Sequence, residues 1–198
     1  MLLANSPFIS LLKDEKVEDV MSYPLSGVSV SAKIKEVAQQ MISRKGRIAV
    51  FDAGTLVGII TASDLIKSLP DVSETEVKVD DFMTKEVVSA DEESSVISIA
   101  KIMGSQRIGS VIITRHHEPF GIFTERDLLT NFLAKGKALF TEVGPECSLP
   151  LIVVPAGTSV HRAAATMALK HIRRLPVVKE EKIVGVVTAR DLVEAYAK

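Results

Sequence analysis

The sequence predicts an α/β chain of the α+β type, made of tandem β-α-β-β-α modules that pack in pairs, sheet against sheet. The first observation is a motif that occurs three times: glycine, two apolar residues, threonine, two variable residues, aspartate and leucine, beginning at Gly58, Gly121 and Gly185. The second is a short opening sequence upstream of each motif, which ends in Met21, Met83 or Cys147. The third is an apolar-x-x-apolar-Ala-x-x-Met stretch between them, which ends in Met41, Met103 or Met167. Repeats at a fixed period indicate one structural unit copied along the chain.

The repeats define the domain organisation. We expect an N-terminal leader at residues 1–16, module 1 at 17–70, module 2 at 77–135 and module 3 at 143–198. The leader carries Phe8, Leu11 and Leu12 at helical spacing, and we expect it to pack on module 1.

Module 1 shows the order of elements. A short apolar strand is expected near residues 25–30, followed by a helix at 33–44 whose apolar side chains recur on one face. Two apolar runs, 48–51 and 56–60, flank an Asp/Gly turn at 52–54, which predicts a β-hairpin. A last helix is expected at 61–69, where Pro70 stops it.

Modules 2 and 3 repeat this order. For module 2 we expect a strand at 86–90, a helix at 94–105, a hairpin of 110–114 and 119–124, and a helix at 126–134. Residues 71–78 and 135–142 are expected to be connections. For module 3 we expect a strand at 151–154, a helix at 159–170, a hairpin of 175–178 and 183–188, and a helix at 190–197.

A module of this size buries too little surface to be stable alone, so pairing is expected. Modules 1 and 2 are adjacent in sequence and form the predicted intramolecular pair. Module 3 is then left without a partner, which predicts a homodimer or higher homo-oligomer across a two-fold axis. Alternatively, module 3 packs on the side of the first pair.

Composition limits the classes of function. A net charge of −1 gives no field that would attract nucleic acid or an anionic membrane. The single cysteine, Cys147, cannot form an internal disulfide, and its position in the repeat predicts a small buried hydrophobe. The longest apolar run, residues 149–156, is too short to span a bilayer. We therefore expect a soluble, cytoplasmic protein with no membrane partner.

Together the openings, the helix pattern, the Arg-Leu-Pro-Val-Val run at 174–178 and the three Gly-x-x-Thr-x-x-Asp motifs resemble the cystathionine-β-synthase (CBS) domain. The resemblance covers nearly all of residues 17–198. It implies modules that associate in pairs and bind adenosine derivatives. Module 3 departs from the pattern at Cys147, and modules 1 and 2 have Ala49 and Ile112 where module 3 has Pro176.

The Thr-x-x-Asp part of the motif has two interpretations. As a capping box, threonine and aspartate satisfy free N–H groups and stabilise each helix by about 1 kcal/mol without any ligand. As a ligand site, the helix N-terminus attracts a phosphate, the threonine hydroxyl adds a contact, and the aspartate accepts hydrogen bonds from ribose hydroxyls. Spacing alone does not separate the two.

The ligand interpretation names nine residues in three equivalent sets. They are Thr61, Ser63 and Asp64; Thr124, Arg126 and Asp127; and Thr188, Arg190 and Asp191. An arginine in the first turn opposes the helix dipole unless an anion is bound, so Arg126 and Arg190 favour phosphate sites in modules 2 and 3. Ser63 predicts that the module 1 site is empty or takes a nucleoside.

The resemblance further implies that adenine lies against the start of a module, near residues 23–25, 85–87 and 149–151. Lys85, Leu149 and Leu151 are the adenine-side residues on this basis. The ligand is expected to be AMP, ADP, ATP or another adenosine derivative such as S-adenosylmethionine, and no catalytic cofactor is expected.

No catalytic residues are assigned, because the chain lacks a Ser/His/Asp order or a glycine-rich phosphate loop. His116 and His117 lack partners at metal-ligand spacing, so no metal site is expected.

The leading hypothesis is a non-enzymatic sensor that reports to an unknown effector protein. Basic residues at 44–47 and 171–174 motivate a nucleic-acid-binding regulator as the alternative, and a scaffold with simple helix caps is the third. Under the sensor hypothesis, Asp127→Ala and Asp191→Ala each abolish binding at their own site.

Overall fold

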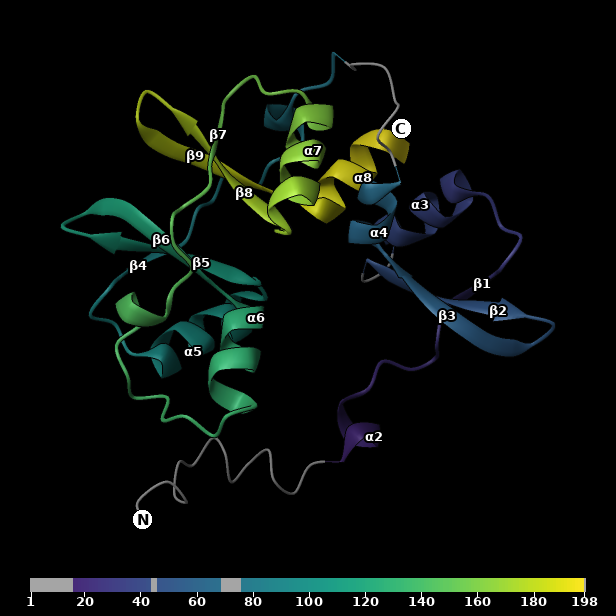
Figure 1. Ribbon diagram of the computed structural model, residues 1–198, viewed down its shortest axis with the longest axis horizontal. Coiled ribbons are helices and arrows are strands. Elements are labelled where there is room, and N and C mark those ends of the chain that lie inside the picture. The colour runs from purple at the N-terminus through teal and green to yellow at the C-terminus, as the bar shows by residue number, and fades with distance from the viewer. Residues whose placement is uncertain (1–15, 44–45, 69–75, 198) are drawn as a thin grey trace. The chain divides into compact units, whose positions relative to one another are not determined.

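Figure 1 shows the computed structural model, in which residues 16–43, 46–68 and 76–197 are described. The expected packing of the leader on module 1, which involves Phe8, Leu11 and Leu12, lies outside these ranges, as do the basic residues Arg44 and Lys45 and residues 69–75. The described chain is a mixed α/β structure with three small sheets of three strands each, so the predicted fold class is confirmed.

The elements follow the predicted β-α-β-β-α order in each module. Module 1 contains α2 (Val17–Val20), β1 (Gly27–Ser29), α3 (Ile34–Ser43), β2 (Arg47–Asp52), β3 (Thr55–Thr61) and α4 (Ala62–Lys67). Module 2 contains η1 (Val79–Asp81), β4 (Ser89–Asp91), α5 (Val96–Gln106), β5 (Ser110–Arg115), β6 (Glu118–Thr124), α6 (Glu125–Asp127) and the π-helical η2 (Leu128–Leu133). Module 3 contains η3 (Gly144–Glu146), β7 (Val154–Pro155), α7 (Val160–Lys170), β8 (Arg174–Lys179), β9 (Lys182–Thr188) and α8 (Ala189–Ala197).

The three sheets have the same topology and register. In each, the first strand pairs parallel with the second, which pairs antiparallel with the third. A register shift falls at the same place in every hairpin, after Val50, Ile113 and Val177. Both residues of each hairpin turn have positive φ, for example His116 at 52° and His117 at 67°. This backbone is typical of the type I′ turn that suits the twist of paired strands.

Two predicted elements differ from the structure. The first strands begin later than the expected 25–30, 86–90 and 151–154, at Gly27, Ser89 and Val154, and in modules 2 and 3 a residue upstream of the strand, Thr84 or Ser148, pairs with another module instead. The helix expected at 126–134 has only one α-helical turn, α6, before it widens into η2. Within η2, Phe132 is fully buried, and its ring packs edge-on against Phe123 at 6.2 Å between centroids.

The chain divides into two compact units, and the divisions do not follow the modules. Of the described residues, unit 1 contains 16–21 together with 87–152, and unit 2 contains those between 22 and 86 together with 153–197. The chain therefore passes between the units at 21/22, 86/87 and 152/153.

Unit 1 is built around the sheet and helices of module 2. Its core includes Ile99, Ile113 and Phe123, and the segment predicted as a simple connection at 135–142 contributes the fully buried Leu139. The backbone N–H of Ile97 donates to the carbonyl of Leu139 at 2.8 Å. This segment thereby satisfies N–H groups at the start of α5 that would otherwise lack partners.

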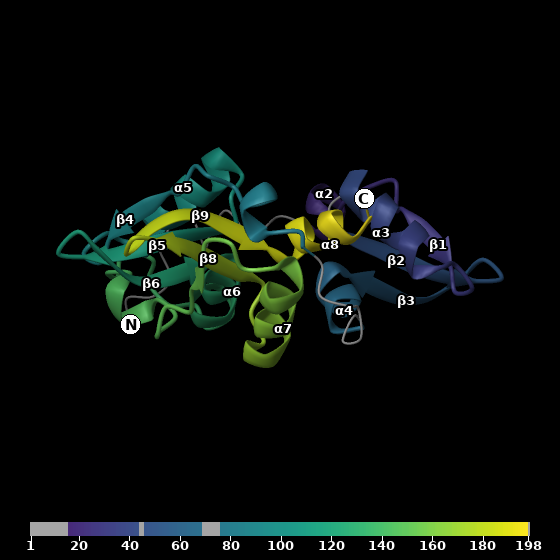
Figure 2. The same ribbon diagram turned by 90° about the horizontal axis from the view of Figure 1, so that it is seen from above.

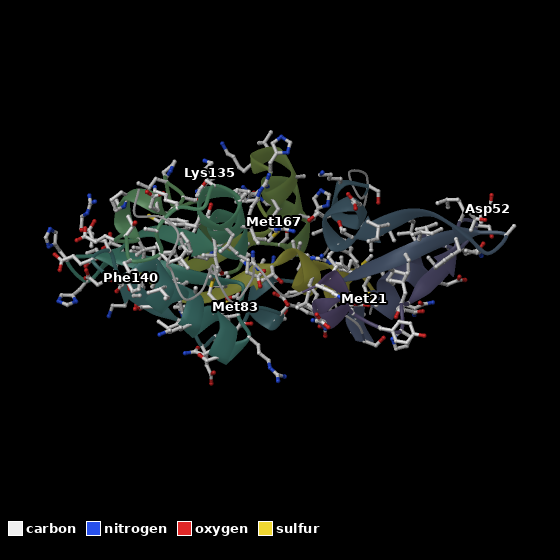
Figure 3. All side chains as sticks on the ribbon, turned by 90° about the horizontal axis from the view of Figure 1, so that it is seen from below. Met21, Asp52, Met83, Lys135, Phe140 and Met167 are labelled. Atoms are coloured by element: carbon white, nitrogen blue, oxygen red, sulfur yellow. The ribbon has the colours of Figure 1, made fainter. Side chains whose placement is uncertain are left out.

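Unit 2 joins modules 1 and 3 through their helices. Helices α3 and α4 of module 1 pack against α7 and α8 of module 3, which Figure 1 shows side by side. In Figure 2, α8 continues from β9 toward α3 and α4. Buried side chains from both modules form this core, among them Met41, Leu65, Met167 and Leu192. The β2–β3 hairpin extends away from the helices and carries Asp52 at its tip (Figure 3).

The opening of each module is taken from here on to include the residues that directly follow Met21, Met83 or Cys147. The opening of module 2 belongs to unit 2, where it pairs with module 3. Thr84 forms two backbone hydrogen bonds with Val186 of β9, at 3.0 and 2.9 Å. Upstream, the N–H of Val79 donates to the carbonyl of Thr158 at 2.9 Å. The opening thus adds a short pairing to the outer edge of β9.

The opening of module 3 binds module 2 in the same way within unit 1. Ser148 exchanges backbone hydrogen bonds with Ile122 of β6, at 2.8 and 3.3 Å. Modules 2 and 3 therefore exchange their openings. The prediction that modules 1 and 2 pair and leave module 3 without a partner is wrong. Module 3 packs its helices on those of module 1, and it exchanges its opening with module 2.

The glycines of β6 and β9 allow this exchange. A Cβ built on Gly121 would overlap the sulfur of Cys147, and one built on Gly185 would overlap the sulfur of Met83, which Figure 3 labels. A side chain at either position would therefore push the opening off the strand. Cys147 also donates to the carbonyl of Gly144 at 3.2 Å, so its sulfur has little freedom to move.

We expect Gly121→Ala to lower the free energy of unfolding by about 1–3 kcal/mol, because the new methyl group overpacks the Cys147 contact. The measurement is a double-mutant cycle with Cys147→Ala, followed by chemical denaturation. Removing the sulfur makes room for the methyl group, so the double variant should be more stable than the sum of the single effects predicts. Strictly additive effects would show that this contact does not constrain position 121.

Candidate functional site

Each candidate site lies where the third strand of a module turns into its last helix. The backbone N–H of Thr61, Thr124 and Thr188 donates to Oδ2 of the aspartate three residues later, at 3.0, 2.9 and 2.7 Å. The threonine hydroxyl donates to the same oxygen at 2.7, 2.7 and 2.8 Å. The capping interpretation of the motif is therefore confirmed in all three modules.

The cap occupies only one oxygen of each carboxylate. Oδ2 takes both capping bonds, and Oδ1 is left for other donors. In module 2, Ser148 Oγ donates to Asp127 Oδ1 at 3.2 Å. A carboxylate oxygen accepts more than one hydrogen bond, so Oδ1 of the same aspartate remains able to accept hydrogen bonds from hydroxyl groups. The two interpretations of the motif are compatible.

The helix N-termini offer fewer free N–H groups than the sequence suggested. The first N–H of each helix, at Ala62, Glu125 and Ala189, already donates to a backbone carbonyl at 3.1, 3.1 and 2.9 Å. The N–H groups of Asp127 and Asp191 donate to their threonine hydroxyls at 3.3 and 3.4 Å. Anion binding at these helices thus depends mainly on side chains.

The site of module 2 includes residues from the opening of module 3. Because Ser148 pairs with Ile122, two residues before Thr124, the opening runs along the end of β6 and reaches Asp127. Leu149 follows Ser148 directly and is about half exposed, and Leu151 is partly buried. The structure therefore brings Asp127 and the predicted adenine-side residue Leu149 to one place within unit 1.

The site of module 3 is built in the same way within unit 2. Thr84 pairs with Val186, two residues before Thr188, and Lys85 follows Thr84. The predicted residues Lys85, beside the end of β9, and Asp191, in α8, therefore hold places equivalent to those of Leu149 and Asp127.

The site of module 1 differs from the other two. Within the described ranges, no opening segment pairs with β3, so Thr61 and Asp64 form a cap with nothing laid across it. Ser63 is partly buried in the first turn of α4.

The two arginines predicted to bind phosphate have different surroundings. Arg190 Nη2 donates to the carbonyl of Ile42 in the last turn of α3, at 2.9 Å. A cation there satisfies a terminal carbonyl and complements the helix dipole, so Arg190 joins modules 1 and 3. Arg126 is exposed on the surface. Within the described ranges Arg190 is the one of the two that donates to another part of the chain, so phosphate binding by Arg190 requires that hydrogen bond to break.

The pKa values of Asp64 and Asp191 shift in opposite directions, because Asp191 is more deeply buried. A hydrogen bond from the Thr61 hydroxyl lowers the pKa of Asp64 below its usual value of 3.8. Burial of the carboxylate away from water raises the pKa of Asp191 above the same value, and the Thr188 hydrogen bonds oppose this only in part.

Sequence reasoning missed the serine and threonine of the openings. Ser148 and Thr84 hold the openings on β6 and β9, and Ser148 also contacts Asp127. A signal was present, because the residue after Met21, Met83 or Cys147 carries a hydroxyl group in every copy: Ser22, Thr84 and Ser148.

The described residues lack two kinds of feature. No helix among them is long and apolar enough to cross a membrane. No group of three or more His, Cys, Asp or Glu side chains among them is arranged to hold a metal ion.

Comparison with known families gives one match that recurs along the chain. The CBS domain model matches residues 17–71, 79–134 and 143–198. An uncharacterized protein of Methanopyrus kandleri is 34% identical over 121 residues, which cover 60% of this chain and 62% of the relative. The chain spans less than two thirds of the length of the first curated relatives that it matches.

Solved structures show the same fold. A protein of Methanocaldococcus jannaschii, proposed as an archaeal homologue of g-AMPK, superposes with a TM-score of 0.76 at 21% identity, over 92% of this chain and 70% of its own. A CBS domain protein of Pyrobaculum aerophilum, solved in complex with AMP, superposes with a TM-score of 0.54 at 27% identity. The second match covers 58% of this chain and 89% of that protein.

The opposite pKa directions give a prediction for the protein without ligand. Carboxyl titration followed by NMR should place the midpoint of Asp64 below 3.8 and that of Asp191 above it. Asp64 then contributes stability that is present above 3.8 and lost as the pH falls through its lowered pKa. Asp191 contributes stability that is complete below 3.8 and lost as the pH rises through its raised pKa.

Asparagine variants test the same assignment at neutral pH, because asparagine keeps an oxygen for the cap and removes the charge. Asp191→Asn should raise the thermal midpoint, since it relieves a buried charge, while Asp64→Asn should lower it slightly. Shifts of the same sign in both variants would contradict the burial argument.

Proposed function

Since the chain belongs to the CBS domain family, we propose that it is a non-enzymatic regulatory protein that binds adenine nucleotides, AMP, ADP or ATP, at the Thr-Asp sites of modules 2 and 3. The observation that carries the proposal is the contact between Ser148 and Asp127. It places the apolar opening of one module beside the carboxylate of another, so one ligand has a ribose acceptor and an apolar surface within reach.

The chemistry of the module 2 site matches the parts of an adenine nucleotide. Oδ1 of Asp127 is available to accept from the vicinal hydroxyls of a ribose, while Oδ2 stays in the cap. Leu149 and Leu151 offer apolar side chains to an adenine ring. Arg126, exposed one residue before Asp127, supplies a guanidinium group for phosphate.

The module 3 site has the same cap but different flanking groups. Lys85 replaces an apolar residue on the adenine side, and its charge favours a ligand with phosphate nearby. Asp191 is more buried than Asp64, and hydrogen bonds from ribose hydroxyls would stabilise its ionised form. Occupancy of this site competes with the Arg190–Ile42 bond if Arg190 turns toward the phosphate.

The structure of the P. aerophilum relative supports the choice of ligand, since a protein similar over the length of a module pair was solved with AMP. Binding regulates only if the ligand prefers one arrangement of the chain over another. A ligand that contacts both Asp127 and Leu149 ties the opening of module 3 to module 2, and a ligand that displaces Arg190 loosens module 3 from module 1. The output passes to an effector protein or to the oligomer.

The alternatives rest on weaker observations. The scaffold hypothesis is supported by the caps alone. The nucleic-acid hypothesis needs a basic surface, and the described basic residues Arg47, His171 and Arg173 are exposed, but a net charge of −1 gives the chain no general attraction for nucleic acid.

The test is calorimetric titration with AMP, ADP, ATP and S-adenosylmethionine. We expect binding of at least one nucleotide, and Asp127→Asn should weaken the module 2 site by about ten- to a hundredfold, because it removes one charged hydrogen-bond acceptor. Asparagine retains the capping oxygen, so thermal unfolding without ligand should change little.

Asp64→Asn is the matched control. It makes the same change at a site without an opening laid across it, so affinity and stoichiometry at the other sites should stay as in the wild type. Undiminished binding in the double variant Asp127→Asn/Asp191→Asn would refute the site assignment, and no binding of any of the four compounds would favour the scaffold.

A further inference from the structure

Two ion pairs hold the opening of module 3 on module 2, one near each end of η3. In the first, Arg115 Nε donates to both carboxylate oxygens of Glu92, at 2.7 and 2.8 Å. In the second, Lys137 Nζ donates to Oε1 of Glu146. All four residues belong to unit 1, as does the candidate site of module 2. We call these two ion pairs the clamp.

Each cation of the clamp also lies over an aromatic ring. The guanidinium carbon of Arg115 is 3.7 Å from the centre of the Phe120 ring, and Lys137 Nζ is 5.2 Å from that of Phe132. Both distances are within the range of a cation–π interaction. The side chains of the two glutamates are only 23% and 17% exposed. The rings and the partial burial restrict both pairs, so they hold their partners more firmly than ordinary exposed ion pairs do.

Glu92 also holds η3 through its backbone. Its carbonyl accepts from the N–H of Gly144 at 2.9 Å, and a Cβ built on Gly144 would lie 2.8 Å from the Cβ of Glu92. Gly144 is buried, and Cys147 and Ser148 follow three and four residues later. The clamp therefore fixes the segment from which Ser148 reaches Asp127.

Of the three modules, module 2 alone carries an acidic and a basic residue at the positions of Glu92 and Arg115. The backbone hydrogen bond that follows the first strand and the register of the hairpin identify the equivalent positions. They are Val30 and Asp52 in module 1, and Ala156 and Lys179 in module 3. The opening of module 2 is anchored on module 3 by a different contact, since Asp80 Oδ2 accepts from the N–H of Gly157 at 2.7 Å.

We propose that the clamp positions the binding surface of the module 2 site, by holding η3 so that Ser148 and Leu149 stay beside Asp127. A segment that is held in its bound arrangement loses less conformational entropy when a ligand arrives, so the clamp raises the affinity without touching the ligand. The positioning role rests on the proposed function of the site, whereas the clamp itself does not.

The single cysteine of the chain reports on the clamp without any nucleotide. Cys147 is partly buried and lies over Gly121, so its alkylation by the uncharged reagent iodoacetamide depends on how often the opening leaves β6. We expect Lys137→Met and Arg115→Met each to speed this reaction in the full chain by about three- to tenfold. Methionine keeps an apolar chain against the aromatic ring and removes the charge with its hydrogen bonds.

Arg115→Met separates the clamp from simple electrostatics. Burial raises the pKa of the Cys147 thiol, and the Arg115 guanidinium opposes this rise. Removal of that cation alone would raise the pKa further and slow alkylation, because the thiolate is the reactive form. Faster alkylation in this variant therefore reports a looser segment. The matched control is Asp80→Ala, which removes the anchor of the other exchanged opening and should leave the Cys147 rate unchanged.

Calorimetric titration with AMP, ADP and ATP tests the positioning role, and an Asp191→Asn background isolates the module 2 site. The affinity should fall by about the same three- to tenfold in the two methionine variants. Charge reversal, Lys137→Glu together with Glu146→Lys, should restore both the slow alkylation and the affinity. A general loss of stability would not be reversed in this way.

The outcomes separate the clamp, the positioning role and the proposed function. Unchanged alkylation in both methionine variants, or a charge reversal that does not restore the slow rate, overturns the clamp. Faster alkylation with unaltered nucleotide affinity overturns the positioning role. No nucleotide binding by the wild type contradicts the proposed function, and the alkylation rates still decide on the clamp.

Discussion

The architecture depends on the outer edges of the third strands. In each module the third strand pairs with the second on one side, and its other side carries backbone N–H and carbonyl groups that need partners. For β6 and β9 those partners are Ser148 and Thr84, each from the opening of another module. This pairing determines where the chain crosses between the two units. It also requires glycine at 121 and 185, and it brings the opening of module 3 to Asp127.

The cap and the candidate site use the same few atoms. Oδ2 of each aspartate holds the helix terminus, and in module 2 Oδ1 of Asp127 accepts from Ser148 of the segment that lies across the end of the strand. The threonine–aspartate pair is therefore needed for the fold whether or not a ligand binds. What distinguishes the modules is the covering segment: an apolar opening at Asp127, a lysine-bearing opening at Asp191, and no described segment at Asp64.

Local features could be predicted from the sequence, and long-range ones could not. Periodicity gave the order of elements, and the Thr-x-x-Asp spacing gave the caps, because both depend on neighbouring residues. The pairing of modules was predicted incorrectly, because three similar copies carry no signal of which opening meets which strand, and proximity in sequence favoured modules 1 and 2. The partner of Arg190 could not be predicted either, since Ile42 lies in another module. Residue type does not reveal which side chains are exposed either. Ile59 and Ile122 are both isoleucine at the same repeat position, yet of the two only Ile122 is covered by a described segment.

The division of the chain into interleaved units has a consequence for its biosynthesis. Residues 87–152 form a continuous stretch with a buried core of their own, so the contacts of that core join residues that are made within a short time of each other. Module 1 is made earlier, but the faces of α3 and α4 that pack on α7 and α8 wait until residues 160–197 have been translated. Its apolar surface is therefore exposed while module 2 and most of module 3 are made, so module 1 is completed after module 2 although it precedes it in the sequence, and it is the natural client of a chaperone.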